Sequence, residues 1–285
     1  MASSSKKASR RTPSLPWTYP APRCLPRDLK AGATPSTNNT SDVRSADITI
    51  DASRGLWARV FCPSAPIADA PPLPVFVYFH GGGFVLFSPS SRPYDAFCRR
   101  LCRELRAVTP TPLPADLVPV HAVDLSSCFL VGDSSGANMV HHVAQRWVSS
   151  SSMSSATSLP SPPLRMRLRL AGAILIQPFF GGEERTEAEV AFDKACRILT
   201  VARADHCWRE FLPEGATRDH PAARVCGEGV ELADTFPPAM VTLRAKGKLV
   251  RVVEYPDAFH GFYAFPEIAD SGKLVEDMKL FVDDH

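Results

Sequence analysis

The segment GDSSG at residues 132–136 constrains the fold of this 285-residue chain more than any other feature. It directly follows the apolar run 128–131, and a serine between small residues after such a run is typical of a sharp turn from a strand into a helix. The turn crowds the backbone, so its flanking positions must be small, and it exposes the serine hydroxyl at the end of a sheet. A single match of this pattern is weak evidence, and its weight depends on the rest of the chain.

Two further segments also follow an apolar run directly. HGGGF at 80–84 follows the apolar run 75–79, and DAFHGF at 257–262 follows the run 250–255. In open α/β sheets, ligands bind just past the carboxyl ends of the strands. The three segments are therefore predicted to lie at the edge of a sheet where a ligand can bind.

Composition limits the classes of function. Hydrophobic residues make up 45% of the chain and charged residues 22%, which favours one large α/β domain with a sizeable core. The net charge of +2 gives no reason to expect a nucleic-acid partner. We expect no membrane partner either, because no apolar stretch reaches about 18 residues and no secretory leader is evident.

The eight cysteines point in the same direction. They form no C-x-x-C pair, so we expect no zinc site and no other metal centre. Their spread predicts reduced, mostly buried thiols in an intracellular, cytoplasmic protein. Cys98 and Cys102, one helical turn apart, are expected in the core.

The N-terminal segment differs from the rest of the chain. Residues 1–45 are rich in serine, proline and basic side chains and are predicted to be a disordered arm, although an organelle transit peptide is an alternative. The folded domain is predicted to span 46–285, with order starting near Val43. We expect a serine-rich linker at 149–155 inside it.

Hydrophobic patterns predict an alternation of strands and helices after an initial hairpin, which favours a mostly parallel sheet. The expected strands are 46–51 and 56–61, which form the hairpin, and then 73–79, 127–131, 170–176, 236–241 and 249–255. The expected helices are 94–105, 136–148, 186–211 with a break that resembles a cap insertion, and 271–284.

Together with QPFFGG at 177–182 and FPEI at 265–268, these motifs resemble, in their order, the plant carboxylesterases of the hormone-sensitive-lipase branch of the α/β-hydrolase fold, relatives of the gibberellin receptors. The resemblance covers about residues 45 to 285. It implies a mostly parallel central sheet with helices on both faces and a small cap region. It also implies a serine carboxylic ester hydrolase for small or medium esters that needs no metal or cofactor.

The resemblance also implies roles for individual residues. Ser134 would be the nucleophile and His260 the base that takes its proton, because a serine hydroxyl is a poor nucleophile without a neighbouring base. The backbone N–H groups of Gly82, Gly83 and Ser135 would form the oxyanion hole. Glycines let the backbone approach the reacting oxygen closely.

The chain departs from the family pattern in two places. About one strand–helix unit is expected to be missing where 107–108 runs directly into the proline-rich segment 109–114. A second gap, where Val241 and Thr242 join 243–248, falls where the family carries the acid of its catalytic triad. Asp257 is more typical of a turn, and Asp234 and Glu254 are weaker candidates, so the triad acid stays unassigned.

Alternatives therefore remain open. The chain could be a non-catalytic protein that binds a small hormone-like ligand, as the gibberellin receptors do, or an inactive truncated product. The receptors depart from the triad at its histidine, whereas this chain keeps His260. The remaining polar and aromatic candidates are assigned structural roles. We expect His80 to anchor the glycine loop at 80–84 and Asp133 to be part of the serine turn. His141 and His142 are expected in packing or facing solvent. Three tryptophans are expected in the core or lining a pocket, with Trp208 a candidate for the acyl pocket: Trp57, Trp147 and Trp208.

Overall fold

The structure is a computed structural model that describes residues 32–36, 42–64, 71–109, 122–153, 168–193, 198–225 and 250–285. Its strands are β1 (Val43–Asp51), β2 (Leu56–Pro63), β3 (Leu73–Phe79), β4 (Val123–Asp133) and β5 (Leu170–Ile176). Its helices are α1 (Arg92–Glu104), α2 (Ser135–Met153), α3 (Glu187–Phe192), α4 (Val201–Phe211) and α6 (Ala269–Asp283), with short 3-10 turns η2 (Ala52–Arg54) and η4 (Phe262–Ala264).

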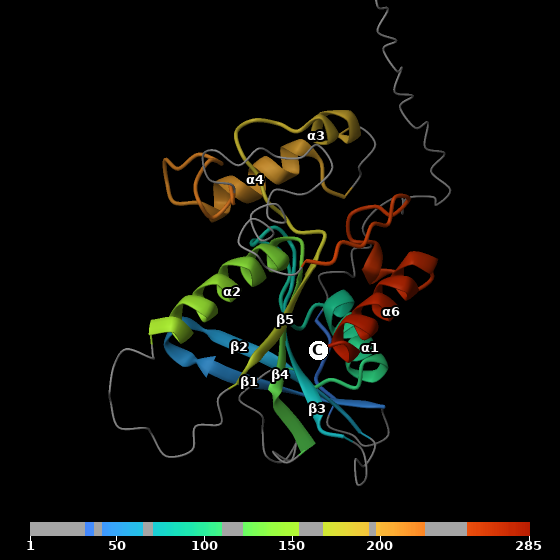
Figure 1. Ribbon diagram of the computed structural model, residues 1–285. Helices are drawn as coiled ribbons and strands as arrows, with labels where there is room; N and C mark the ends of the chain where they lie inside the picture. The colour runs from blue at the N-terminus through green and yellow to red at the C-terminus, as the bar shows by residue number, and fades with distance from the viewer. Residues whose placement is uncertain are drawn as a thin grey trace, which may run out of the picture.

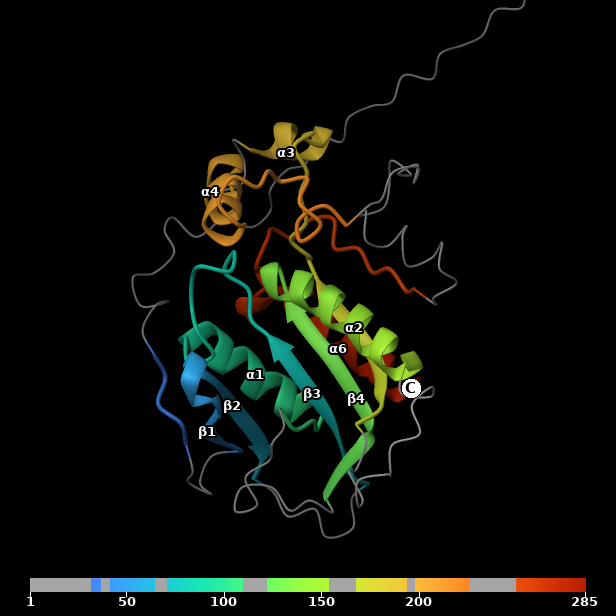
Figure 2. The ribbon, with the colours of Figure 1, turned by 90° about the vertical axis from the view of Figure 1, so that its left-hand side faces the viewer.

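The central sheet is parallel, with the strand order β3-β4-β5. Helix α2 covers one face, and α1 and α6 cover the other (Figures 1 and 2). Helices α3 and α4 lie beyond the carboxyl edge of the sheet, where they form a small cap. This architecture confirms the predicted α/β-hydrolase fold, with helices on both faces of a parallel sheet.

The strands are almost continuously apolar because both faces of the sheet are buried. Phe76 of β3 and Phe129 of β4 are fully buried, and their rings meet edge to face at 5.6 Å. Apolar side chains of α1 and α6 complete this core, among them Phe97, Leu101 and Met278. Residues that face the core therefore fix the strand register, and the register brings the strand ends to a common edge.

An antiparallel hairpin, β1–β2, confirms the hairpin predicted from the alternation at 46–61. Val108 and Thr109 join it to the central sheet. Thr109 exchanges backbone hydrogen bonds with Phe61 of β2, while Val108 bonds to Pro74 and Phe76 in β3. Val108 and Thr109 thus lie between β2 and β3, directly before the position where the sequence predicts a missing strand–helix unit.

Two predicted elements are wrong. Helix α2 continues to Met153, so the linker expected at 149–155 is helical over 149–153. Helix elongation adds one hydrogen bond per residue, and serine is only a moderately poor helix former, so a serine run does not stop a helix by itself. Residues 250–255 do not form a strand, and within the described residues no strand pairs with them.

Other expectations hold or are not tested. The break predicted within 186–211 separates α3 from α4, and each helix begins at a threonine, Thr186 and Thr200, whose hydroxyl accepts a backbone N–H of its first turn. The strand predicted at 236–241 and the second gap lie outside the described residues. The domain start at residue 46 stays a prediction, although Ala33 already donates a backbone hydrogen bond to Ser90.

A buried ion-pair network fastens the hairpin to α1. Arg59 of β2 is 4% exposed, and its guanidinium donates to Asp95 of α1 at 2.9 Å and to Asp47 of β1 at 2.7 Å. Asp95 also accepts from Arg99 at 2.8 Å. A buried guanidinium needs these acceptors, because an unpaired buried charge is strongly unfavourable.

Replacing Asp95 with alanine should therefore destabilise the fold by about 3–5 kcal/mol, because the buried Arg59 loses a partner. Denaturant unfolding followed by circular dichroism measures this change in the free energy of unfolding. Glu104→Ala, which removes a solvent-exposed i,i+4 pair with Arg100, is the control and should cost less than about 1 kcal/mol. Equal effects of the two substitutions would contradict the assignment.

Candidate active site

Ser134 sits at the turn between β4 and α2 in a left-handed backbone conformation, with φ of 50°. Such a conformation is costly for a residue with a side chain and is found mainly at functional sites. A Cβ on Gly136 would overlap with the carbonyl oxygen of Phe79, and a Cβ on Gly132 would lie 2.6 Å from the Gly136 carbonyl carbon. This close approach is why the residues on both sides of the turn must be small.

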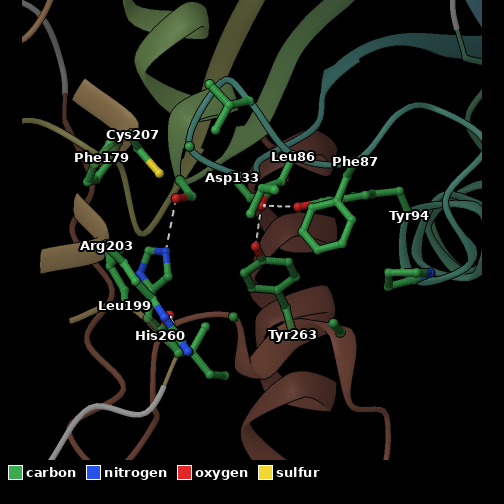
Figure 3. A pocket seen from close by; sticks show the side chains of 18 of the residues that line it. Leu86, Phe87, Tyr94, Asp133, Phe179, Leu199, Arg203, Cys207, His260 and Tyr263 are labelled. Atoms are coloured by element: carbon green, nitrogen blue, oxygen red, sulfur yellow. Dashed lines mark hydrogen bonds between the residues drawn. The ribbon is translucent and has the colours of Figure 1, made fainter. Parts of the chain in front are cut away.

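His260 reaches the same point from the C-terminal part of the chain. Its Nε2 lies 2.9 Å from Ser134 Oγ, although the two residues are 126 positions apart in sequence (dashed line in Figure 3). The structure thus brings together the two side chains that the motifs predicted as nucleophile and base. The distance is that of a hydrogen bond. In the tautomer protonated on Nδ1, the serine hydroxyl donates and Nε2 accepts.

Burial lowers the pKa of His260 from its ordinary value of 6.5 to about 4. The imidazole is therefore neutral at physiological pH and can accept a proton. Among the described residues, no carboxylate is hydrogen-bonded to it. Asp257 and Glu254 are exposed, and Asp234 lies outside the described residues, so the triad acid remains unassigned.

The glycine loop after β3 curves toward the serine. Gly82 and Gly83 have φ of 107° and 60°, conformations that favour glycine. Within the described chain their N–H groups have no acceptor, and the N–H of Ser135, the first residue of α2, has no carbonyl in a preceding turn. His80 Nδ1 lies 2.8 Å from the Gly81 carbonyl oxygen, in line with its predicted anchoring role.

Asp133 is fully buried, and its carboxylate accepts four hydrogen bonds. Oδ1 accepts from Tyr78 at 2.7 Å and from the Gly81 N–H at 2.9 Å. Oδ2 accepts from Tyr94 at 3.2 Å and from Tyr263, and these two bonds are drawn in Figure 3. Burial raises the pKa of Asp133, and the four donors act against that shift. The residue predicted simply as part of the turn therefore connects β3, the glycine loop, α1 and η4.

The sequence did not reveal this network. Three of the chain's five tyrosines meet at Asp133, and burial followed by the charge of Asp133 raises the pKa of each. A usable signal was present, since an aspartate between an apolar strand and a serine turn must be buried and so needs donors. The identity of those donors depends on contacts between distant segments.

Ser134, His260 and the glycine loop line a cavity of about 300 Å³. Its walls are mostly apolar and include Leu86, Phe179 and Leu199, while α4 contributes Cys207 and Arg203 (Figure 3). The cap therefore forms one side of the pocket, as expected for the insertion 186–211. A largely apolar, concave site with a few polar groups is typical of small-molecule binding.

Several predicted residues lie away from the cavity. Trp208, a candidate for the acyl pocket, is 2% exposed and stacks behind Phe179 with ring centroids 4.5 Å apart. It does not line the pocket, because Phe179 stands between. His141 is buried, and His142 lies 3.3 Å from the Ala222 carbonyl oxygen, consistent with packing roles. Cys98 and Cys102 are buried in the core, as predicted.

In the described ranges, no three histidine, cysteine or acidic side chains are grouped so that they could hold a metal ion. In the same ranges, no helix has the length and apolar character needed to cross a membrane. Among the described residues, the site places a serine hydroxyl in contact with an imidazole, beside N–H groups of the glycine loop that have no acceptor there.

Known sequences and solved structures show what the chain is similar to. A family profile described as the alpha/beta hydrolase fold matches residues 76–112 and 118–243. A probable carboxylesterase 6 of Arabidopsis thaliana is 36% identical over 208 residues, covering 63% of this chain and 58% of that protein, so the match spans less than two thirds of the relative. Carboxylesterase 20 of the same plant is 32% identical over 73% of this chain and 70% of its own length.

The gibberellin receptor GID1C of Arabidopsis thaliana is 31% identical over 313 residues, covering 90% of this chain and 85% of the receptor. This alignment is longer than the chain, so some positions of the receptor have no counterpart here, consistent with the two gaps seen in the sequence. Among solved structures, an esterase of the archaeon Pyrobaculum calidifontis superposes with a TM-score of 0.64 at 22% identity, covering 85% of each chain.

The buried imidazole leads to a prediction about pH. His260 should titrate near pH 4, and the fold should lose stability as pH falls from about 6.5, where the unfolded chain takes up the proton, toward 4. NMR of imidazole-labelled protein, with the His260 signal assigned from a His260→Gln variant, measures this pKa. A value at or above 6.5 would contradict it and would indicate an acid beside the ring.

Proposed function

This chain belongs to the α/β-hydrolase family, and from that membership we propose that it is a serine carboxylic ester hydrolase that works through an acyl-enzyme. The observation that carries the proposal is the 2.9 Å contact between Ser134 Oγ and His260 Nε2 at the wall of an apolar pocket. A neutral base in contact with a serine hydroxyl is the arrangement that nucleophilic catalysis requires.

In the first half of the reaction, Ser134 Oγ attacks the ester carbonyl carbon while His260 Nε2 takes the hydroxyl proton. The carbonyl oxygen gains negative charge, and the N–H groups of Gly82, Gly83 and Ser135 stabilise it. Loss of one such donor typically raises the barrier by about 3–4 kcal/mol. The intermediate then collapses, His260 gives its proton to the departing alcohol, and an acyl-Ser134 ester remains.

In the second half, water takes the place of the alcohol. His260 removes a proton from the water as the water attacks the acyl carbon, and the same N–H groups again hold the oxyanion. Collapse returns the proton to Ser134 Oγ and releases the carboxylic acid. The reaction is a hydrolysis in which Ser134 and His260 end as they began.

Pocket size supports small or medium esters as substrates. The cavity volume of about 300 Å³ is at the lower end of the range for small-molecule sites. Its walls of Leu86, Phe179 and Leu199 suit an apolar acyl or alcohol group, because burying such a group is favourable in proportion to its area.

A second candidate is a non-catalytic protein that binds a small, hormone-like ligand in the same pocket. Similarity to a gibberellin receptor over 90% of the chain favours it, as does the lack of a carboxylate on His260 in the described residues. In serine proteases, loss of the triad acid lowers turnover about 10⁴-fold. Turnover by the purified protein separates the two candidates, because a receptor would bind without hydrolysis.

Purified protein should hydrolyse p-nitrophenyl butyrate, and Ser134→Ala should reduce kcat by at least about 10³-fold because no nucleophile remains. Ser126→Ala is the matched control, since Ser126 is an exposed serine near the opposite end of the same strand. It should leave kcat unchanged. A folded Ser134→Ala variant that keeps the activity of the wild type would exclude the mechanism.

Ser134 and His260 should also behave as one unit. His260→Ala should slow turnover about as much as Ser134→Ala, and the double variant should be no slower than either single variant. Steady-state kinetics of the four proteins test this. Losses that multiply in the double variant would mean that the two residues act separately.

A further inference from the structure

The side chain of Gln177 holds the backbone on both sides of His260. Gln177 follows β5, and its Oε1 accepts a hydrogen bond from the Gly261 N–H at 2.8 Å. Its Nε2 donates to the carbonyl oxygen of Phe259 at 3.3 Å. The amide of Gln177 thus pairs with the backbone carbonyl before His260 and with the backbone N–H after it. These two bonds fix the position of the His260 backbone, from which its side chain extends.

The backbone around Gln177 holds the nucleophile as well. The N–H of Ser134 donates to the carbonyl of Ile176 at 2.9 Å, and the N–H of Phe179 donates to the carbonyl of Ser134 at 2.9 Å. Residues 176–179 therefore bind the Ser134 backbone through their main chain. The Gln177 side chain binds residues 259–261, which carry His260 and are called the histidine loop below. The same short segment therefore positions both Ser134 and His260, whose side chains are 2.9 Å apart.

Gln177 shares an unusual backbone conformation with Ser134. Its φ is 43°, in the left-handed region that residues with side chains rarely adopt. Such conformations persist only where surrounding contacts enforce them, and they concentrate at functional sites. At Gln177 the enforcing contacts are the two side-chain bonds to the histidine loop and the neighbouring bonds to Ser134.

We infer that Gln177 is a positioning residue that sets the contact between His260 and Ser134 by clamping the histidine loop. The inference rests on the proposed function. A triad acid orients the imidazole through its ring nitrogen, whereas Gln177 acts through the backbone on either side of the ring. Because its amide is uncharged, it orients the base without adding charge beside the imidazole.

The test is Gln177→Met, which keeps the length and bulk of the side chain but removes both hydrogen bonds. It should lower kcat about 10- to 100-fold with KM changed less than about twofold, because misplacement of a catalytic group by about 1 Å costs this much in rate. Gln145→Met, the same change at an exposed glutamine of α2 that does not line the pocket, should leave both constants unchanged. An unchanged kcat in Gln177→Met would overturn the inference.

A double-variant cycle separates positioning from a general effect on folding. The rate at which a fluorophosphonate labels Ser134 should fall in Gln177→Met but should not fall further when this change is added to His260→Ala, because the clamp acts through the histidine. Labelling should still reach one equivalent per chain, which shows that the sites remain folded. Equal slowing in both backgrounds would overturn the inference.

NMR of the His260 ring provides a measurement that needs no turnover. In the wild type, the imidazole should show one tautomer, protonated on Nδ1, with Nε2 accepting from Ser134; in Gln177→Met it should show a mixture of tautomers. Lack of hydrolysis by the wild type with this NMR change would refute the proposed function and leave the clamp supported. An identical His260 spectrum in the two proteins would refute the clamp.

Discussion

The buried carboxylate of Asp133 is the interaction on which the rest of the site depends. It stands beside Ser134 and accepts hydrogen bonds from the glycine loop and from tyrosines of β3, α1 and η4. Because a buried carboxylate is strongly unfavourable without donors, these segments can pack only in the arrangement that supplies them. The same requirement that stabilises the core therefore sets the glycine loop, the serine turn and the C-terminal segment relative to one another.

The reactive groups follow from this frame and from the parallel sheet. Strands β3, β4 and β5 end at one edge, and each is followed by one part of the site: the glycine loop, the serine turn and the segment that contains Gln177. The histidine loop then docks on the last of these. The polar groups that face the pocket are few and its walls are apolar, which keeps His260 neutral and strengthens its interaction with a neighbouring hydroxyl.

Local patterns predicted much of this arrangement. The apolar runs before residues 80 and 132 are strands β3 and β4, and the hairpin and the break within 186–211 were found from alternation and from helical pattern. Prediction was wrong where an element depends on its surroundings: residues 250–255 have strand-like sequence but no described neighbour to pair with, and the serine run after Trp147 continues a helix that was already formed. Gln177 and the tyrosines around Asp133 were not assigned roles because their partners lie 39 to 130 residues away.

The junction at Val108 and Thr109 joins two sheets of different kinds, because Thr109 bridges antiparallel to Phe61 of the hairpin and Val108 bridges parallel to Val75 of the central sheet. Within the described ranges, these two residues supply the backbone hydrogen bonds between the hairpin β1–β2 and the central sheet. The free energy at which a segment opens depends on its buried apolar contacts as well as on its backbone hydrogen bonds. The hairpin stays attached through its side chains, because Val60 and Cys62 share a buried cluster with Val75 of β3 and because Arg59 pairs with Asp95 of α1. Hairpin and sheet should therefore exchange their amide hydrogens as one cooperative unit, although their backbones meet at only two described residues.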